Sequence, residues 1–79
     1  MSVKLTFIAS NRNGNFGNIV LALTQMGYKP SNFKLDKSAD SPLESIQMQL
    51  KAVQKIESGI LRSIQQQVPT IVDIQVDPI

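Results

Sequence analysis

The sequence predicts an α+β fold in which two helices cover one face of a four-stranded antiparallel sheet. Three observations support this prediction. Apolar and polar residues alternate in four short segments, which is the period of a half-buried strand. Apolar residues recur at helical spacing in two further segments, one after the first of these strands and one after the third. With 79 residues, the chain is long enough for one small core. Residues 1–79 are therefore expected to form a single domain with the element order βαββαβ.

The first unit of the chain is a strand, a polar turn and a helix. The strand is expected over residues 3–10 and ends at residues 11–15, which are rich in turn-forming Asn and Gly. Apolar residues then recur at i, i+3, i+4 and i+7, the spacing of one buried helical stripe: Phe16, Ile19, Val20 and Leu23. Gly27 is expected to end this helix, because a residue without a Cβ adopts the left-handed conformation most easily.

The rest of the chain supplies three strands and a second helix. A second strand is expected over residues 32–36 and a polar loop over residues 37–42. A third strand carries alternating apolar residues: Ile46, Met48 and Leu50. Helical spacing returns over residues 53–68, and Pro69 prevents further helix. The last strand is expected over residues 71–77, and its apolar face carries Val72, Ile74 and Val76.

These elements assemble most economically into two layers, because each strand has one apolar face and each helix one apolar stripe. The order βαββαβ with both helices on one face of the sheet is the ferredoxin-like arrangement. Right-handed crossovers place the first and third strands side by side at the centre of the sheet. The opposite face is expected to be mostly polar and to carry Ile8, Ile71 and a row of Gln side chains.

The composition excludes several classes of function. Charged residues make up 18% of the chain and the net charge is +2, too little for an electrostatic nucleic-acid binder. The absence of Cys and His excludes thiol catalysis, Ser-His nucleophile pairs and imidazole metal sites. No apolar run approaches the ~20 residues of a membrane span. We therefore expect a cytoplasmic, non-catalytic domain that takes no metal or cofactor and binds neither nucleic acid nor a membrane.

The turn after the first strand is the candidate site: Asn11-Arg12-Asn13-Gly14-Asn15-Phe16. A helix that begins near Asn15 leaves its first backbone N–H groups without intrahelical partners, and its dipole favours an anion there. Gly14 lets a ligand approach the backbone, Asn11 offers an amide donor and an acceptor, and Phe16 can wall an apolar pocket. These groups suit a free amino acid. An ordinary turn that binds nothing is the alternative.

Several residues in this part of the chain also form a recognisable sequence pattern. They are Asn11-x-x-Gly14, the helical stripe Ile19, Val20 and Leu23, and the ending Gln25-x-Gly27-Tyr28. The run 5–28 resembles an ACT domain, and within that family it is most similar to the ACT domain of the acetolactate synthase small (regulatory) subunit. The later part agrees in order, with Ser-Pro-Leu-Glu at 41–44 leading into the third strand and Ile-Val-Asp-Ile at 71–74 opening the last strand.

The resemblance implies a regulatory subunit in branched-chain amino acid biosynthesis that binds an amino-acid effector, typically valine, and acts on a catalytic enzyme subunit. It also implies a homodimer in which two sheets join side by side with the effector sites at the interface. The resemblance implies effector contacts from Asn11, Gly14 and the next two residues, and from the two residues that follow Gly27-Tyr28 in the partner. With the rest of the turn, the candidate ligand-binding residues are Asn11, Arg12, Asn13, Gly14, Asn15, Phe16, Lys29 and Pro30.

Two alternatives stay open. Lys29 and Pro30 stand where the family pattern has a short amide and an aliphatic residue, which favours a dimerising scaffold that braces a catalytic partner without an effector. A small acylphosphatase-like hydrolase would instead use Arg12 with one of the neighbouring Asn residues, although the turn lacks a glycine-rich phosphate cradle.

Overall fold

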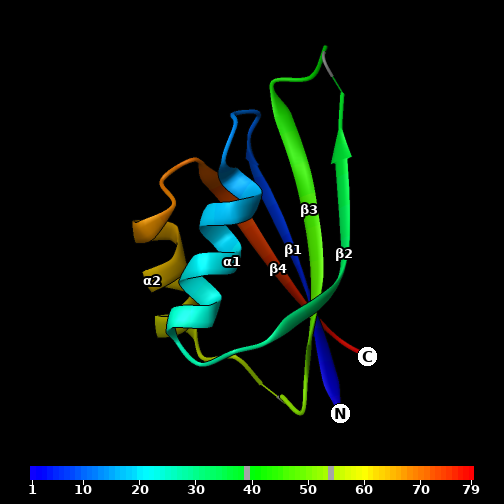
Figure 1. Cartoon of the computed structure of the whole chain (residues 1–79), viewed down its shortest axis with the longest axis vertical. Coiled ribbons are helices and arrows are strands. Elements are labelled where there is room, and N and C mark those ends of the chain that lie inside the picture. Colours follow the sequence, from blue (N-terminus) through cyan, green and yellow to red (C-terminus); the bar gives the residue numbers. More distant parts are fainter. Residues whose placement is uncertain (39, 54) are drawn as a thin grey trace.

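The computed structural model describes residues 1–38, 40–53 and 55–79. Over these residues the chain forms six elements in the predicted order: β1 (Ser2–Ser10), α1 (Asn15–Gln25), β2 (Pro30–Lys37), β3 (Leu43–Lys51), α2 (Ser58–Gln67) and β4 (Ile71–Pro78). The strands form one antiparallel sheet with the order β2-β3-β1-β4, and the helices lie together on one side of it (Figure 1). The predicted ferredoxin-like fold is confirmed, with β1 and β3 side by side at the centre.

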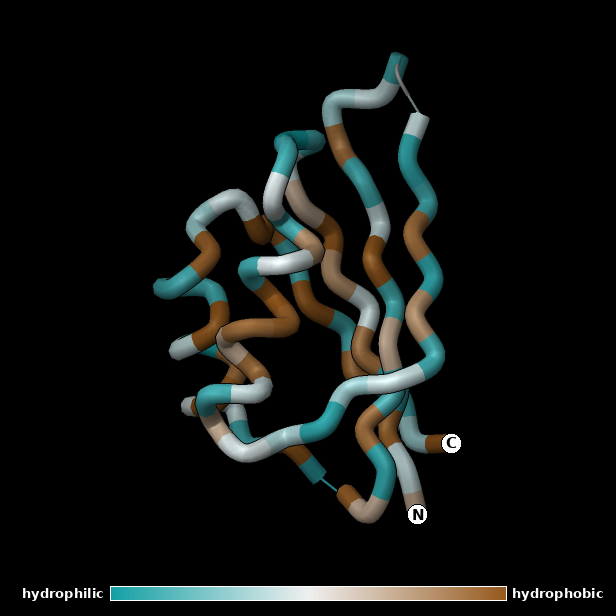
Figure 2. Tube along the Cα trace, in the orientation of Figure 1, coloured by the Kyte–Doolittle hydropathy of each residue, from teal (hydrophilic) through white to brown (hydrophobic). Residues whose placement is uncertain are grey.

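The core lies between the sheet and the helices. Hydrophobic residues alternate with polar ones along the central strands (Figure 2), and the hydrophobic set of β1 and β3 is buried: Val3, Leu5, Phe7, Ala9, Ile46, Met48 and Leu50. Ile19 and Leu23 of α1 and Ile64 of α2 cover these side chains. Each large apolar side chain buried in this way contributes about 1.5–3 kcal/mol to folding.

β2 is an edge strand, because it pairs only with β3. It runs over residues 30–37, longer than the predicted 32–36, and its pairing is interrupted between Ser31 and Lys34, where Asn32 has a φ of 53°. Leu35 lies opposite Ile46, so its side chain is on the same sheet face as the core, yet it is 52% exposed. The helices therefore leave the apolar side of this edge partly uncovered.

The predicted position of Ile71 on the open face of the sheet is wrong. Ile71 is 6% exposed and belongs to the core, whereas Val72, predicted to be apolar-facing, is 56% exposed. The cause is a β-bulge: Ile8 pairs with Asp73 and Ala9 pairs with Ile71, so Val72 is the extra residue on β4. One extra residue moves the side chains before it to the opposite face.

The predicted second helix starts later than expected. α2 begins at Ser58, whereas helical spacing pointed to residue 53. Val53 and Ile56 still pack on the core, from the connection that follows Ala52 with its φ of 62°. The apolar spacing therefore predicted correctly that Val53 and Ile56 pack on the core, but it predicted a helix that starts too early. Two predicted positions, Ala39 in the loop and Gln54 in the helix, lie outside the described residues.

Candidate functional site

The turn between β1 and α1 is built around Gly14. This residue directly precedes α1 and has a φ of 91°, in the left-handed region that a residue without a Cβ adopts at little cost. The N–H of Asn18 donates to the Gly14 carbonyl oxygen at 2.9 Å and closes the first turn of the helix. The chain therefore reverses sharply from strand to helix at the predicted position.

The start of α1 carries free backbone donors. The N–H groups of Asn15, Phe16 and Gly17 precede the first intrahelical hydrogen bond, and among the described residues no side chain caps this end of the helix. No acidic residue lies in the first helical turn either. Because the helix dipole places a partial positive charge at this end, the start of α1 favours an anion such as a carboxylate.

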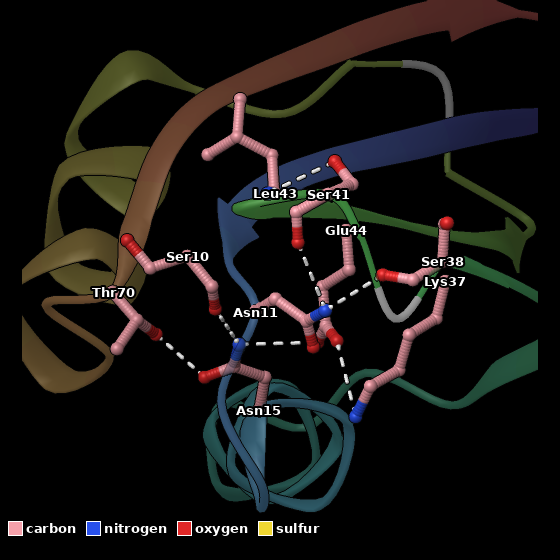
Figure 3. Close-up of polar contacts among 9 residues, drawn as sticks. All are labelled: Ser10, Asn11, Asn15, Lys37, Ser38, Ser41, Leu43, Glu44 and Thr70. Carbon is pink, nitrogen blue, oxygen red and sulfur yellow. Dashed lines mark hydrogen bonds and ion pairs between the residues drawn. The ribbon is translucent and has the colours of Figure 1, made fainter.

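Asn15 holds the start of α1 against the sheet. Its side chain is buried, and its Nδ2 atom donates to the Ser10 carbonyl oxygen at 2.6 Å and to Glu44 Oε1 at 3.1 Å. Its Oδ1 atom accepts a hydrogen bond from Thr70 Oγ1 at 2.6 Å (Figure 3). The side chain of this predicted ligand residue thus joins three segments of the protein, which leaves only its backbone N–H for a ligand.

Asn11 ties the same turn to the loop between β2 and β3. Its Nδ2 atom donates to the carbonyl oxygens of Ser38 at 3.1 Å and Ser41 at 3.2 Å, and its backbone N–H donates to the Pro42 oxygen at 2.9 Å. No donor within the described parts of the chain reaches Asn11 Oδ1. The carboxamide of Asn11 therefore keeps an acceptor, but not its donors, for a ligand.

Glu44 and Lys37 complete this corner, and neither was predicted from the sequence as a site residue. The Glu44 side chain is 3% exposed and lies between Asn15 and Lys37, whose Nζ atom is 3.8 Å from Glu44 Oε2 (Figure 3). The sequence did hold a signal for Glu44, because it continues the alternating apolar series of β3 at residues 44, 46, 48 and 50. An acidic residue on a core-facing position usually has a specific partner.

An exposed apolar pair flanks the start of α1. The rings of Phe16 in α1 and Phe33 in β2 meet edge to face, with centroids 5.1 Å apart and planes at 79°. Their exposed fractions are 37% and 47%. We call Phe16, Phe33 and Leu35 the edge cluster; it lies on the helix-bearing side of the sheet. The contribution of Phe33 was also missed, since its contact with Phe16 depends on how α1 packs.

The remaining residues predicted to bind a ligand do not all lie together in the structure. Arg12 and Asn13 are exposed in the turn. Lys29 and Pro30 lie at the other end of the sheet: Pro30 pairs with Leu50, at the end of β3 far from the turn. A single chain therefore brings the residues of the turn together with Lys37, Glu44 and the edge cluster, but not with Lys29 or Pro30.

Two hollows of the described surface are lined by residues outside the turn. One, of about 340 Å³, lies beside the β2–β3 loop and is lined by Ile8, Asp36, Ser38, Ser41, Leu43, Glu44 and Ser45. The other, of about 560 Å³, lies at the start of α2 and is lined by Lys55, Ile56, Glu57, Ser58, Leu61 and Val76. Among residues 1–38, 40–53 and 55–79, no cluster of three or more potential metal ligands occurs and no helix is long and apolar enough to cross a membrane.

No family model and no curated protein matches this sequence. Solved structures share its fold. A formyltetrahydrofolate deformylase from Pseudomonas putida KT2440 is similar to the whole of this chain over 29% of its own length, with a TM-score of 0.80 and 9% identity. The ligand-free regulatory subunit of aspartate kinase from Thermus thermophilus is similar to 98% of this chain over 50% of its own length, with a TM-score of 0.73 and 11% identity.

The ACT domain from the GTP pyrophosphokinase of Chlorobium tepidum is similar to this chain over nearly the full length of both. The match covers 100% of this chain and 97% of that domain, with a TM-score of 0.54 and 10% identity. The chain thus spans half or less of the length of the first two proteins and almost all of the third. At these identities the likeness establishes a shared fold.

Proposed function

We propose that this chain is a non-catalytic regulatory ACT domain that binds a free amino acid at the start of α1. One observation carries the proposal: α1 begins with uncapped N–H groups directly beside the exposed Phe16–Phe33 pair. The N–H groups suit the carboxylate of an amino acid, and Asn11 Oδ1 suits its ammonium group. The edge cluster suits an apolar side chain, which agrees with valine as the effector.

A second copy of the chain would complete this site. β2 is an edge strand with an uncovered apolar side, and such edges pair readily with another strand. Antiparallel pairing of two β2 strands would bring the start of one strand, at Lys29 and Pro30, towards the end of the other at Lys37. The residues that one chain keeps apart would then approach the turn from the second copy, and the two sheets would join.

The resemblance in sequence favours a specific role within this proposal. The Asn11-x-x-Gly14 register places Gly14 at the left-handed position before α1, and Gly27, with a φ of 92°, follows the end of the same helix. We therefore propose the small subunit of acetolactate synthase or of a similar amino-acid biosynthetic enzyme. An effector would bias the catalytic partner by about 1–3 kcal/mol of coupling, with a dissociation constant of roughly micromolar to millimolar.

A scaffold without an effector is the second candidate. It is favoured by the hydrogen bonds of Asn11 and Asn15, whose amide donors are all directed at the protein itself. In that case the corner only fixes α1 on the sheet, and β2 serves to dimerise the chain beside a catalytic partner.

Thermal unfolding in the presence of each of the twenty amino acids at millimolar concentration tests the leading proposal. A ligand that binds only the folded chain raises the melting temperature. We expect valine or another apolar amino acid to do so, and Phe16→Ala to weaken its binding about tenfold, since a lost apolar contact is worth about 1–3 kcal/mol. Leu21→Ala is the matched control, because Leu21 is also exposed on α1 but lies outside the edge cluster.

The outcome also separates the two candidates. If none of the twenty amino acids changes the melting temperature, effector binding is refuted. A chain that is then dimeric by light scattering, and that becomes monomeric with Leu35→Asp but not with Leu21→Asp, supports the scaffold.

A further inference from the structure

The turn before α1 contains an Asn-Gly pair that differs from every other Asn position in the chain. The sequence has five Asn residues, and only Asn13 is followed by glycine. The other four precede larger side chains: Asn11 precedes Arg12, Asn15 precedes Phe16, Asn18 precedes Ile19 and Asn32 precedes Phe33. Because Gly14 has no Cβ, its backbone nitrogen is the least shielded of the five nitrogens that follow an Asn.

The structure leaves both members of this pair free to react with each other. Asn13 and Gly14 are exposed, and within the described chain neither the Asn13 side chain nor the Gly14 N–H takes part in a hydrogen bond. The neighbouring amides differ sharply in this respect, because those of Asn11 and Asn15 are each held by two acceptors. The turn thus protects two of its three Asn side chains and leaves the middle one unprotected.

We propose that Asn13 is a site of spontaneous deamidation that places a new carboxylate at the start of α1. The Gly14 nitrogen loses its proton and attacks Cγ of Asn13, a C–N bond forms, and the side-chain nitrogen leaves as ammonia. Water then opens the resulting five-membered imide at either carbonyl, giving an aspartate or an isoaspartate at position 13. One water is consumed and one ammonia released, and no oxidant or reductant is required.

The product carboxylate is close in sequence to the start of α1, where the proposed effector carboxylate would bind. Position 13 is two residues before the first residue of α1, whose free N–H groups and dipole favour a negative charge. Modification lowers the net charge of the chain by one and removes no group that holds the turn to the sheet. Competition with the effector rests on the proposed function, whereas the modification itself does not.

The modification is tested by ageing the purified chain in mildly alkaline buffer and following each Asn by peptide mass spectrometry. We expect position 13 to change from amide to acid with a rate that rises with hydroxide concentration, while the other four Asn residues stay intact. Asn13→Gln is the matched control, because a Gln side chain would have to close a larger ring. If position 13 keeps its amide as long as the other four, the proposal is refuted.

The competition is tested with Asn13→Asp, Asn13→Gln and valine. Each variant should unfold at about the wild-type temperature without ligand. A negative charge near the carboxylate site should weaken valine binding about fivefold in Asn13→Asp, the effect of roughly 1 kcal/mol of repulsion in water. Asn13→Gln keeps a neutral amide at this candidate ligand residue and should weaken valine binding less. Equal affinities of the two variants refute the competition. A wild-type chain that binds no amino acid contradicts the proposed function instead, and the mass measurement still decides whether Asn13 is modified.

Discussion

In the described parts of the chain, two connections lead from a strand to a helix, from β1 to α1 and from β3 to α2, at equivalent places in the two halves. The first is polar: Asn11 and Asn15 tie it to neighbouring segments through directional hydrogen bonds. The second is held by apolar contacts, because Val53 and Ile56 pack on the core. Among the described residues, no side chain caps the start of either helix. The two connections therefore differ in what holds them in place. We call the β1–α1 connection the polar corner and the β3–α2 connection the apolar corner.

This difference shows why only one corner is a good candidate site. Hydrogen bonds from Asn15 fix the start of α1 through its side chain and leave the backbone N–H groups beside it free. At the second corner, the apolar anchor Ile56 and the acidic residue Glu57 directly precede the first N–H groups of α2. Glu57 has no ion-pair partner among the described residues and repels an incoming anion, whereas Glu44, the carboxylate beside Asn15 at the start of α1, is paired with Lys37. The polar corner thus combines fixed geometry with open donors beside a paired carboxylate, whereas the open donors of α2 lie beside Glu57, which is unpaired among the described residues.

Truncation of the apolar anchor should have the largest effect. Ile56→Ala removes a side chain that is 7% exposed and leaves a cavity in the core, so we expect a loss of about 3 kcal/mol in the free energy of unfolding. Urea unfolding followed by circular dichroism measures it. Val72→Ala is the control, because Val72 is 56% exposed at the bulge, and it should change stability by less than about 0.5 kcal/mol. Similar losses in the two variants would contradict the assignment of Ile56 as an anchor.

Truncation of the polar anchor should come next. Asn15→Ala removes three hydrogen bonds and leaves the buried Glu44 carboxylate short of a donor, so we expect a loss of about 2 kcal/mol. Asn18→Ala, an exposed Asn of the same helix, should be nearly neutral. Equal stability of the two variants would show that the buried amide of Asn15 does not hold the corner.

The two corners also differ in how well the sequence predicts them. Periodicity predicted the strands, the helices and the burial of Ile56, because burial of apolar groups repeats along the chain. The bulge at Val72 was not predictable. The alternation of apolar and polar residues in β4 fits a regular strand without an extra residue just as well, and in such a strand Val72 faces the core. The bonds of Asn15 to Glu44 and Thr70 join residues 29 and 55 positions apart, and no local pattern encodes them. The sequence thus predicted the turn, but not the distant residues that hydrogen-bond to its side chains.

The ion pair at the polar corner should matter less than the amide. Lys37→Ala removes a cation that is 3.8 Å from Glu44 Oε2 and whose side chain is 40% exposed, so we expect a loss of no more than about 1 kcal/mol. The loss should shrink as salt is added, because mobile ions screen a partly exposed pair. Unfolding in low and high salt measures this, with Lys34→Ala on the same strand as the control. A loss that is large and unaffected by salt would mean that Glu44 depends on Lys37.

Substitution of the glycine near the start of each helix should have the smallest effect on stability, and it compares the two corners directly. Gly14 has a φ of 91°, so Gly14→Ala forces a Cβ into the left-handed region and should cost about 1 kcal/mol. Gly59 lies in the first turn of α2. Apart from its chain neighbours and the backbone of its own helix, no atom of the described residues lies within 4 Å of the place that a Cβ would take there. Gly59→Ala should therefore stabilise the chain by about 0.5 kcal/mol through its higher helix propensity. Thermal unfolding of the two variants compares them directly. Opposite signs are expected because Gly14 is held in the left-handed region and Gly59 lies in a regular helical turn. A gain in stability from Gly14→Ala would contradict that difference.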